Sequence, residues 1–526
     1  MTATISRTRY DLLVVGSGFA GSILAMIGQR LGLSVLLVEK EHHPRFAIGE
    51  SSTPLANLLL EEIAERYQLP RLAAFSKWGT WTSLHPEIRC GLKRGFTFIP
   101  HRRGSAERGR PFMVAASPND RIADTHWLRS DLDAYLFGEA RELGVECLEG
   151  ADIRSLERVS GNWRVEGVQE GKPFACEVGF VVDASGPRGF LQRQLGLGTK
   201  AWRSLPETST LFSHFVDVRR WDTGAGLESE SMPYPVDDAA VHHVLEDGWI
   251  WVLRFGHGVT SAGVAMRREG ADRFGLHRGE VGWKAVLEAY PSVAELFREA
   301  TPTEPFRYWP QLSFCSERAV GEGWAMLPFA AGFVDPLLST GFPLTLLGVL
   351  RLAEVLGKHL GSVELPGALE EYEQTLFREL SAAEDLISAL YASMDDFEVF
   401  KRLSLLYFAA ASFTETARRL GRPELAQGFL LREDPSIYPH FASVCAEARR
   451  LAVDRAAGGG FDPAQRVGLL ESVRAAITPI DIAGLTRLDR GDRYPVDLED
   501  LYGAREKVKA TRAEIDAMLR RCGALQ

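Results

Sequence analysis

The sequence has few cysteines, and their spacing excludes several kinds of site. Six occur, at Cys90, Cys147, Cys176, Cys315, Cys445 and Cys522. None forms a Cys-x-x-Cys pair, and none has a histidine at the spacing of a metal ligand. Scattered cysteines in a long chain are typical of reduced thiols. The pattern therefore predicts neither a disulfide framework nor a metal site, and it indicates a cytoplasmic protein.

Excess positive charge and uninterrupted apolar runs are also absent. The net charge of −10 and the pI near 5.8 disfavour nucleic acid as a partner, and they disfavour a polybasic membrane anchor. Residues 1–10 contain no apolar core of their own, so no secretory signal is expected. The apolar stretch 337–356 is interrupted by polar residues, which favours a buried helix over a membrane span.

What is present begins with a pattern typical of a parallel sheet. A chain of 526 residues is expected to form two or three domains. Residues 10–15 and 34–39 are apolar runs, and residues 19–31 between them have helical periodicity, so they predict a βαβ unit. Further along, residues 125–144 predict a helix. Residues 162–168 and 174–182 predict a hairpin that returns to the first sheet.

The pattern changes in the middle of the chain. Segments 211–218, 242–255 and 260–266 alternate with polar turns, which predicts an antiparallel sheet where substrate would lie. Residues 323–329 return to the first sheet, and the chain after residue 366 is almost wholly helical. The predicted fold is α/β: a Rossmann-type FAD-binding domain (1–204 and 321–360), an antiparallel-sheet substrate domain (205–320) and a helical C-terminal region (361–526).

A glycine-rich turn follows the first predicted strand. It reads Gly16-Ser17-Gly18-Phe19-Ala20-Gly21, and Glu39 ends the next strand. Gly16, Gly18 and Gly21 allow a tight turn, close approach to a pyrophosphate and close helix packing, while Glu39 would accept hydrogen bonds from a ribose hydroxyl. The turn with these flanks predicts a dinucleotide site.

Two further segments favour FAD over NAD. Arg129 begins an amphipathic stretch, and Asp183 ends an apolar strand in an Asp-x-x-Gly pattern. Both resemble motifs of the para-hydroxybenzoate-hydroxylase-like flavoproteins, in which the arginine reaches the phosphates and the strand end packs against the pyrophosphate and ribose. The alternative for Arg129 is an ordinary surface arginine.

A second small-residue turn precedes a long apolar helix. The segment runs from Phe333 to Gly341, and Ser339, Thr340 and Gly341 would offer backbone N–H groups at a helix N-terminus. Four donors there lack intrahelical partners, and the helix dipole favours an anion. The anion could be a carboxylate, a flavin charge or a halide.

Three motifs together resemble flavin-dependent halogenases. They are the segment Gly49-Glu50-Ser51-Ser52-Thr53-Pro54, the turn that ends at Gly341, and Gly248-Trp249-Ile250-Trp251. The likeness covers about the first 360 residues and is strongest to enzymes that act on phenols and pyrroles.

The resemblance implies a function and a set of partners. FADH2 supplied by a flavin reductase would react with oxygen, and the flavin hydroperoxide would oxidise chloride or bromide. The product would halogenate an electron-rich aromatic, either free or tethered to a carrier protein. Halide would bind at Ser339, Thr340 and Gly341. Further cofactor contacts would come from Arg45, Ser51, Phe333, Asp335 and Pro336.

In that family a lysine holds the oxidised halogen near the substrate, and two lysines compete for this role. Lys77 lies at about the family's distance from the Gly-Glu-Ser motif, in a matching Lys-x-Gly pattern, and is favoured. Lys93, on an apparent strand, is the second choice.

The sequence departs from the family in three places. The Trp-x-Trp motif continues as Val252-Leu253-Arg254, Pro328-Phe329 replaces an expected Gly-Asp, and Leu338 stands where tryptophan halogenases carry a glutamate. An apolar residue there cannot orient a lysine, which argues against tryptophan as substrate.

Two other functions stay open. One is an FAD monooxygenase or related oxidoreductase that kept the scaffold without halide chemistry. The other is a flavin-binding protein without turnover. Trp249 and Trp251 are predicted to line the substrate region, although such an aromatic stripe is often only core.

Overall fold

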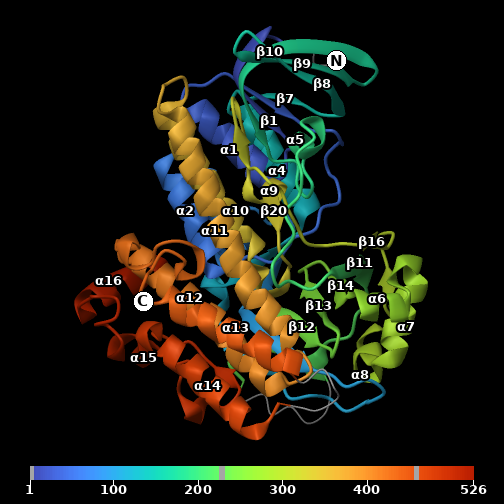
Figure 1. Cartoon of the computed structure of the whole chain (residues 1–526), viewed down its shortest axis with the longest axis vertical. Coiled ribbons are helices and arrows are strands. Elements are labelled where there is room, and N and C mark those ends of the chain that lie inside the picture. Colours follow the sequence, from blue (N-terminus) through green and yellow to red (C-terminus); the bar gives the residue numbers. More distant parts are fainter. Residues whose placement is uncertain (1–4, 224–231, 455–460, 526) are drawn as a thin grey trace.

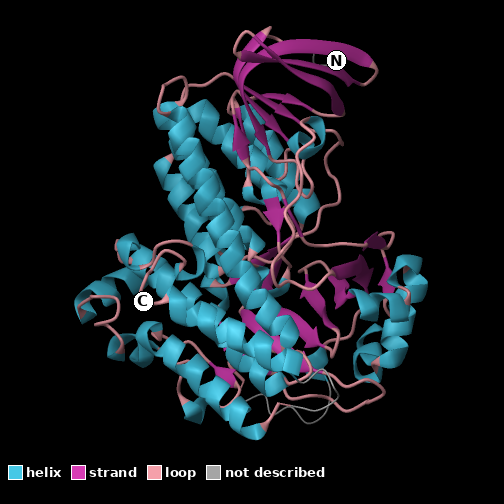
Figure 2. Cartoon of the chain, viewed as in Figure 1, coloured by secondary structure: helices cyan, strands magenta, loops and turns pink. Residues whose placement is uncertain are grey.

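Two large sheets, two small two-stranded sheets and a large helical region make up the described part of the protein (Figures 1 and 2). The computed structural model describes residues 5–223, 232–454 and 461–525. One group of strands lies at the top of the view in Figure 2 and the other at lower right, and long helices run between and beside them. The predicted fold class is confirmed.

The first sheet is built around the predicted βαβ unit. Strands β1 (Arg9–Val15) and β2 (Val35–Val38) pair in parallel, and helix α1 (Phe19–Arg30) connects them. On the other side of β1 lies β10 (Lys172–Asp183), which also pairs in parallel and is followed by β19 (Trp324–Met326). The carboxyl ends of β1, β2 and β10 therefore meet at one edge, where ligands bind in open parallel sheets.

Other predicted elements of this sheet are present with shifted bounds. Strand β9 (Asn162–Gln169) forms the predicted hairpin with β10, and β8 (Ala151–Val159) extends it. Strand β7 (Glu146–Leu148) completes the parallel edge beside β2. The short strand β18 (Val320–Gly321) pairs with β19.

The predicted helix at 125–144 is wrong over its first residues. Residues Asp124–Trp127 form strand β6, which pairs with β3 (Cys90–Lys93), and helix α4 begins only at Arg129 and ends at Glu142. The misreading has a physical reason: β6 is buried on both faces, so it lacks the alternation that identifies a strand. Consequently Lys93 and Asp124 stand opposite each other in a ladder.

The second sheet contains the predicted antiparallel strands. Its centre is β11 (Thr208–Val216), β14 (Thr260–Arg267), β13 (Gly248–Arg254) and β12 (Ala240–Val244), paired antiparallel in that order. The predicted single strand 242–255 is therefore two strands. The short strands β15 (Thr301–Pro302) and β16 (Arg307–Trp309) pair with β11.

This sheet also recruits strands from outside the middle of the chain. Strand β4 (Gly95–Pro100) pairs in parallel with β12, and β5 (Phe112–Ala115) follows it. Strand β21 (Arg493–Tyr494) adds in parallel to β5. The sheet is therefore mixed, and the predicted domain boundaries stay a prediction. Helices α6 (Arg268–Phe274), α7 (Glu280–Ala289) and α8 (Pro291–Ala294) cover one end, at lower right in Figure 1.

Helix α10 (Gly341–His359) is the apolar helix that the sequence predicts. Residues 337–359 are long and apolar enough to cross a membrane, but 72% of their most apolar window is buried inside the protein. Helix α11 (Leu365–Ala392) packs against α10, and the two run side by side in Figure 1. The burial supports the reading of α10 as a core helix.

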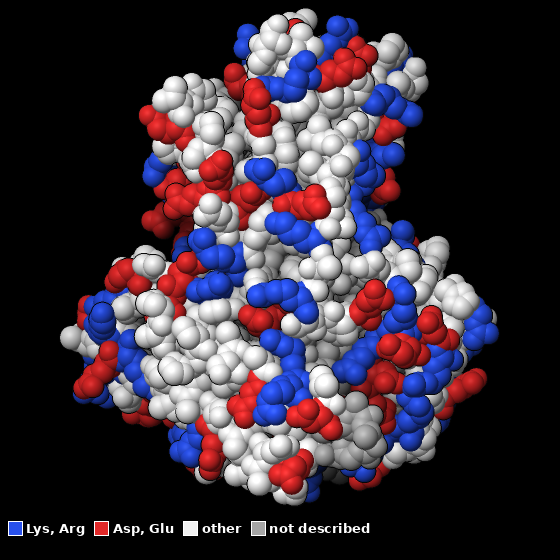
Figure 3. Space-filling model, in the orientation of Figure 1, with Lys and Arg blue, Asp and Glu red and all other residues white. Residues whose placement is uncertain are grey.

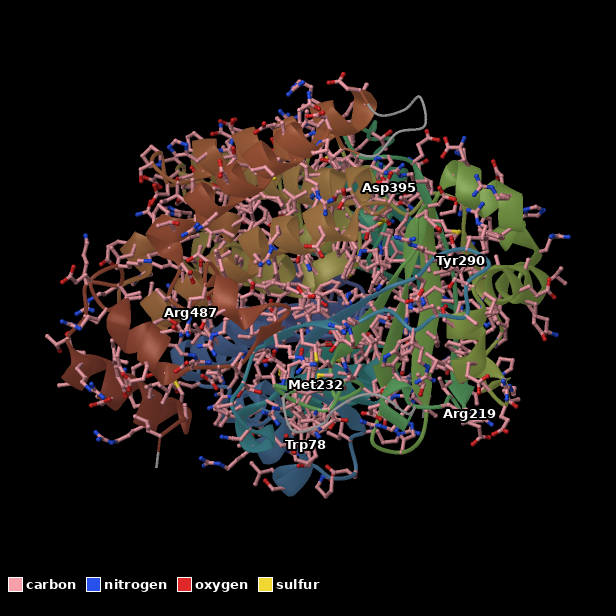
Figure 4. The ribbon with its side chains drawn as sticks, turned by 90° about the horizontal axis from the view of Figure 1, so that it is seen from below. Trp78, Arg219, Met232, Tyr290, Asp395 and Arg487 are labelled. Carbon is pink, nitrogen blue, oxygen red and sulfur yellow. The ribbon has the colours of Figure 1, made fainter. Side chains whose placement is uncertain are left out.

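The remaining helices are α2 (Pro54–Arg66), α3 (Trp78–Leu84), α5 (Phe190–Gln194), α9 (Pro328–Ala331), α12 (Phe397–Arg419), α13 (Tyr438–Asp454), α14 (Pro463–Ile477), α15 (Leu498–Gly503) and α16 (Arg512–Cys522). Of these, α5 and α9 lie close to the first sheet, and the helices from α12 onward lie in the lower half of Figure 1. In Figure 4 the C-terminal helices, with Arg487 labelled, lie beside the strands of the second sheet. Ring contacts of Phe96 with Phe408 and of Phe98 with Phe400 join α12 to this sheet.

The surface carries charges of both signs. On the face shown in Figure 3, basic and acidic side chains are interspersed over both halves of the molecule. In the loop before β5, Arg103 pairs with Asp247, and the guanidinium of Arg108 lies over the ring of Trp221. These arginines are held by the protein's own groups, which does not suggest a dedicated anionic partner.

Candidate active site

The glycine-rich turn after β1 has the geometry that the sequence predicts. Gly16 has a φ of 98°, and a Cβ there would lie 2.6 Å from the carbonyl oxygen of Ala184. A Cβ at Gly21 would collide with the carbonyl oxygen of Gly16. The first glycine therefore permits the turn, and the third lets α1 pack against it.

Glu39 lies beside this turn, as expected. Its Oε2 accepts hydrogen bonds from the backbone and hydroxyl of Ser17 and pairs with Arg45 at 3.1 Å. Burial alone would raise the pKa of Glu39, but Arg45 and the Ser17 hydrogen bonds lower it below the usual value. The side chain therefore stays a carboxylate, which can accept hydrogen bonds from the hydroxyl groups of a ribose.

Arg129 is a buried structural arginine that also faces the turn. It makes two hydrogen bonds to Asp133, at 2.9 and 2.8 Å, and donates to the carbonyl oxygens of Ile48 and Gly49 at 3.1 Å. These bonds hold the Gly-Glu-Ser segment against α4. The alternative of an ordinary surface arginine is excluded, because the residue is 8% exposed.

A cavity of about 810 Å³ joins most of the predicted cofactor and halide residues, and we call it the cofactor cavity. Its lining includes Gly16, Gly18, Glu39, Arg45, Ser51, Arg129, Trp249, Trp251, Phe333, Pro336, Ser339 and Gly341. A Cβ at Gly18 would lie 3.3 Å from an Arg129 guanidinium nitrogen and 3.7 Å from that of Arg45. Backbone amides and two arginines suit a pyrophosphate, so these residues fit FAD. The Ser51 hydroxyl is buried without a hydrogen-bond partner in the described structure and is free to meet a ligand.

We expect Gly18→Val to abolish FAD binding. The two γ-methyl groups would project between the turn and both guanidinium groups, where the pyrophosphate must approach the backbone. The measurement is the quench of flavin fluorescence on titration of FAD into the purified variant. Gly468→Val on the surface of α14, where a Cβ meets nothing within 4 Å, is the control. Wild-type affinity in Gly18→Val would show that the turn does not bind the cofactor.

Asp183 and Asp335 lie behind the cavity wall. Asp183 accepts hydrogen bonds from the backbone N–H groups of Ser185 and Leu191, so it shapes the loop that follows β10. Asp335 accepts from the N–H of Leu337 at 2.9 Å and from the hydroxyl of Tyr391 at 3.0 Å. Both aspartates are fully buried. A direct role for either in binding FAD stays a prediction.

The turn before α10 has an unusual backbone. Leu338 and Ser339 have φ values of 65° and 55°, in the left-handed region that non-glycine residues rarely adopt. Two such residues in succession cost energy, and they persist here because Leu338 is fully buried and Asp335 holds Leu337. Thr340, buried behind Ser339, and Gly341 then begin the helix with amides that have no intrahelical partner.

Aromatic side chains close the cofactor cavity on the side of the second sheet. Trp249 donates to the hydroxyl of Tyr391 at 3.2 Å, and Trp251 donates to that of Ser261 at 3.2 Å. Phe329, at the position of the missing Gly-Asp, lines the cavity and packs edge-on against Phe333. The tryptophan stripe is thus both core and cavity wall.

The two candidate lysines lie in different surroundings. Lys77 is partly exposed, forms an ion pair with Glu61 at 3.0 Å and does not line the cofactor cavity. Lys93 is fully buried at the end of β3, donates to the carbonyl oxygen of Ser52 and lies 3.9 Å from the centre of the Phe96 ring. Burial lowers the pKa of Lys93, and Asp124 opposes that shift.

A second cavity, of about 220 Å³, lies close to Lys93, because Phe96 both lines it and contacts the lysine. Its lining includes Phe96, Asp124, Asn57, Tyr407 and Phe408, and it also includes Lys77. Lys93 contacts Ser52 and Phe96. Ser51, next in the chain to Ser52, lines the cofactor cavity, whereas Phe96 lines the second cavity. Lys93 itself lines neither cavity, but it contacts residues that lie at or beside both of them.

Several residues near these cavities escaped the sequence reasoning. Asn57 donates to Asp124 at 2.7 Å inside the protein, and Asp124 lies directly before the segment predicted as helix. Glu50 pairs with His214 at 2.8 Å across the two sheets; burial would lower the pKa of His214, but Glu50 raises it. Glu50 belongs to the Gly49–Pro54 motif, and that motif is the sequence feature that could have identified it. Among the described residues no cluster could hold a metal ion.

Comparison with known proteins gives one family and several relatives. The family model described as tryptophan halogenase matches residues 125–400. The tetracycline 7-halogenase of Kitasatospora aureofaciens is 29% identical over 418 residues, which cover 76% of this chain and 73% of that protein. The monodechloroaminopyrrolnitrin halogenase PrnC of Pseudomonas fluorescens is 26% identical over 406 residues, covering 76% and 70%.

Solved structures share the fold. The crystal structure of halogenase PltM in complex with phloroglucinol and FAD superimposes with a TM-score of 0.81 at 23% identity. The match covers 92% of this chain and 99% of that one. The helical C-terminal region is therefore part of the shared architecture.

Proposed function

The chain belongs to the tryptophan halogenase family of flavin-dependent enzymes, and we propose that it halogenates a small electron-rich aromatic of the phenol or pyrrole type. It is an FAD-dependent oxidoreductase that uses FADH2 and a halide, chloride or bromide. The substrate, the residues that carry the reaction and the reductase that supplies FADH2 are the parts proposed here.

One observation carries the proposal most directly. The buried Lys93 contacts Ser52, the neighbour of a residue that lines the large cavity with the two predicted turns, and Phe96, which lines a smaller cavity with aromatic walls. An oxidised halogen formed in the first cavity must pass to a substrate that never touches the flavin. Lys93 would lie on that passage, which favours it over Lys77 for the halogen-carrying role.

The halide would bind at the turn before α10. Reduced FAD, when bound, would supply the two electrons that reduce oxygen to the peroxide level. That oxidant would convert the halide to hypohalous acid, and its second oxygen would leave as water. The protein's part is to hold the anion beside the flavin, with the amides of Thr340 and Gly341 and the positive end of α10. The strained turn at Leu338 and Ser339 keeps these amides in place, and its tie through Asp335 to Tyr391 anchors it to α11.

Lys93 would hold the halogen near the substrate. Its burial lowers the pKa and so favours the neutral amine, which is the form that can take up a halogen atom. The Ser52 carbonyl and the Phe96 ring fix the side chain, so the reactive nitrogen has a defined position. Lys77 forms an ion pair with Glu61 and is more exposed, so hypohalous acid that reached it would escape to solvent.

The second cavity would hold the aromatic substrate. About 220 Å³ is below the usual range for drug-sized ligands, roughly 300–1,000 Å³, so a single ring is favoured over a fused polycycle. The relatives halogenate tetracycline and an aminopyrrolnitrin, as their names state. Leu338 is apolar and fully buried, which argues against tryptophan itself. Free and carrier-tethered substrates both remain candidates, and cytoplasmic location stays a prediction.

The test supplies the enzyme with a flavin reductase, NADH, FAD and bromide. A panel of phenols and pyrroles is then examined by mass spectrometry. We expect a bromine isotope pattern in at least one product and none without bromide. A product that gains oxygen at the same rate without halide would favour the alternative, an FAD monooxygenase. Two departures from the family pattern support this alternative. Phe329 stands in place of the Gly-Asp motif, and the Trp-x-Trp motif continues as Val252-Leu253-Arg254.

A further inference from the structure

The second cavity contains a carboxylate that the protein itself does not satisfy. Asp124 is 3% exposed and lines the cavity. Its Oδ1 accepts a hydrogen bond from the Asn57 amide at 2.7 Å, but its Oδ2 has no hydrogen-bond partner among the described residues. A buried carboxylate oxygen without a donor is costly, so its presence in a cavity wall calls for a ligand that donates.

The Asn57 side chain repeats this pattern. Its amide nitrogen donates to Asp124, while its carbonyl oxygen is buried and unpaired in the described part of the chain. Asn57 lies on α2 and Asp124 on β6, so two separate elements bring their free acceptors to the same cavity. Together they offer two unpaired acceptor oxygens to a ligand.

The walls of the second cavity favour an aromatic ligand. Phe96, Tyr407 and Phe408 line the same cavity, and their rings contact one another at 5.2–6.2 Å. Such walls favour the flat face of a ring. The hydrogen bonds and ion pairs of the nearby cations go to other groups: Arg419 pairs with Glu61 and Glu415, and Lys93 donates to Ser52. Burial raises the pKa of Asp124, and the charge of Lys93 opposes that shift without a direct hydrogen bond.

We infer that Asp124, positioned by Asn57, accepts a hydrogen bond from the ring hydroxyl of a phenolic substrate and so selects phenols over arenes that carry no donor. The inference rests on the proposed function, because it assigns the second cavity to the substrate. Asp124 stands opposite Lys93 in the β3–β6 ladder, so a ring held at Asp124 lies next to the proposed halogen carrier. A carboxylate acceptor also increases electron density on the hydroxyl oxygen and thus on the ring.

The test measures binding and needs no turnover. Phenol and anisole, which has the same ring but no O–H donor, are titrated into the full-length protein and followed by calorimetry. We expect wild type to bind phenol at least tenfold more tightly than anisole. Asp124→Asn keeps the side-chain volume but removes the charge, and it should lose most of this preference while anisole binding stays within about twofold.

A matched control removes an acid from the same segment. Asp120 is half exposed, pairs with Arg94 and does not line the second cavity. Asp120→Asn should therefore keep the wild-type preference for phenol. Equal binding of phenol and anisole by wild type would overturn the inference without any variant. So would a wild-type preference in an Asp124→Asn protein that still binds anisole.

The outcomes separate this inference from the proposed function. If the enzyme brominates phenols but Asp124→Asn leaves phenol affinity unchanged, only the role of Asp124 fails. If wild type shows no bromide-dependent product yet prefers phenol in an Asp124-dependent way, the binding role stands and the halogenase assignment for this cavity fails. Should Asp124→Asn lose both ligands by misfolding, the comparison of phenol with anisole on wild type still decides.

Discussion

Lys93→Ala is expected to stop halogenation while flavin oxidation continues. The lysine lies beyond the cofactor cavity, so its loss leaves the reaction of reduced flavin with oxygen intact but removes the group that passes halogen to the substrate. Product formation should fall on the order of a hundredfold or more, the scale on which a positioned catalytic group contributes. Oxidation of FADH2 and release of peroxide or hypohalous acid should proceed at wild-type rates.

Two variants control for indirect effects. Lys93→Met fills most of the buried volume without an amine, so a loss equal to that of Lys93→Ala would exclude a packing defect. Lys77→Ala removes the other candidate, which lines the second cavity but is held in an ion pair with Glu61, and should retain most activity. The measurement is brominated product against FADH2 consumed. Normal yield from Lys93→Ala together with loss in Lys77→Ala would reverse the assignment and restore the choice that the sequence favoured.

The sequence-based prediction favoured Lys77 because of its distance along the chain from the Gly-Glu-Ser motif. That distance carries no information about whether a side chain is buried. Lys93 lies in a four-residue strand of mixed composition. No pattern in the surrounding residues predicts that the lysine side chain is buried. Its burial follows from pairing with β6, and β6 was itself misread as helix. Contacts between distant segments decide such a site, so local patterns could not reveal it.

The glycine turn and the acidic residue of the cofactor cavity, in contrast, could be predicted from the sequence. The glycines of the first turn are required by local geometry, since Gly16 has a positive φ and a side chain at Gly21 has no space. When all the residues that a site requires lie close together in the chain, the sequence shows them as a motif. The second cavity combines α2, β4, β6 and α12, which come from both ends of the chain, and no single segment indicates it.

The second sheet shows the same limit at the level of the fold. Its antiparallel centre has the period-two alternation from which strands are predicted. The strands β4 and β21 join it from residues 95–100 and 493–494, and both joins are parallel pairings over long sequence distances. Such pairings depend on tertiary packing, here the aromatic contacts between β4 and α12, and have no local signal.

Gly341→Val is expected to remove halide dependence while leaving the fold intact. A Cβ at Gly341 would lie 3.7 and 3.8 Å from the rings of Phe333 and Phe329, which is ordinary contact, so the residue can be replaced without collision. Gly341 lines the cofactor cavity, however, and the branched side chain would occupy space beside the amides proposed to hold the halide. Loss of a preorganised site for charge costs about 3–4 kcal/mol, or roughly a hundredfold to a thousandfold in rate.

The measurement is bromide titration of product formation, with peroxide release followed in parallel. Wild type should saturate with bromide and release little peroxide, whereas Gly341→Val should make little product at any bromide concentration and release peroxide instead. Gly367→Val, on the open surface of α11, provides a valine of equal size away from the cavity and should behave as wild type. A Gly341→Val enzyme that saturates at the wild-type bromide concentration would place the halide elsewhere.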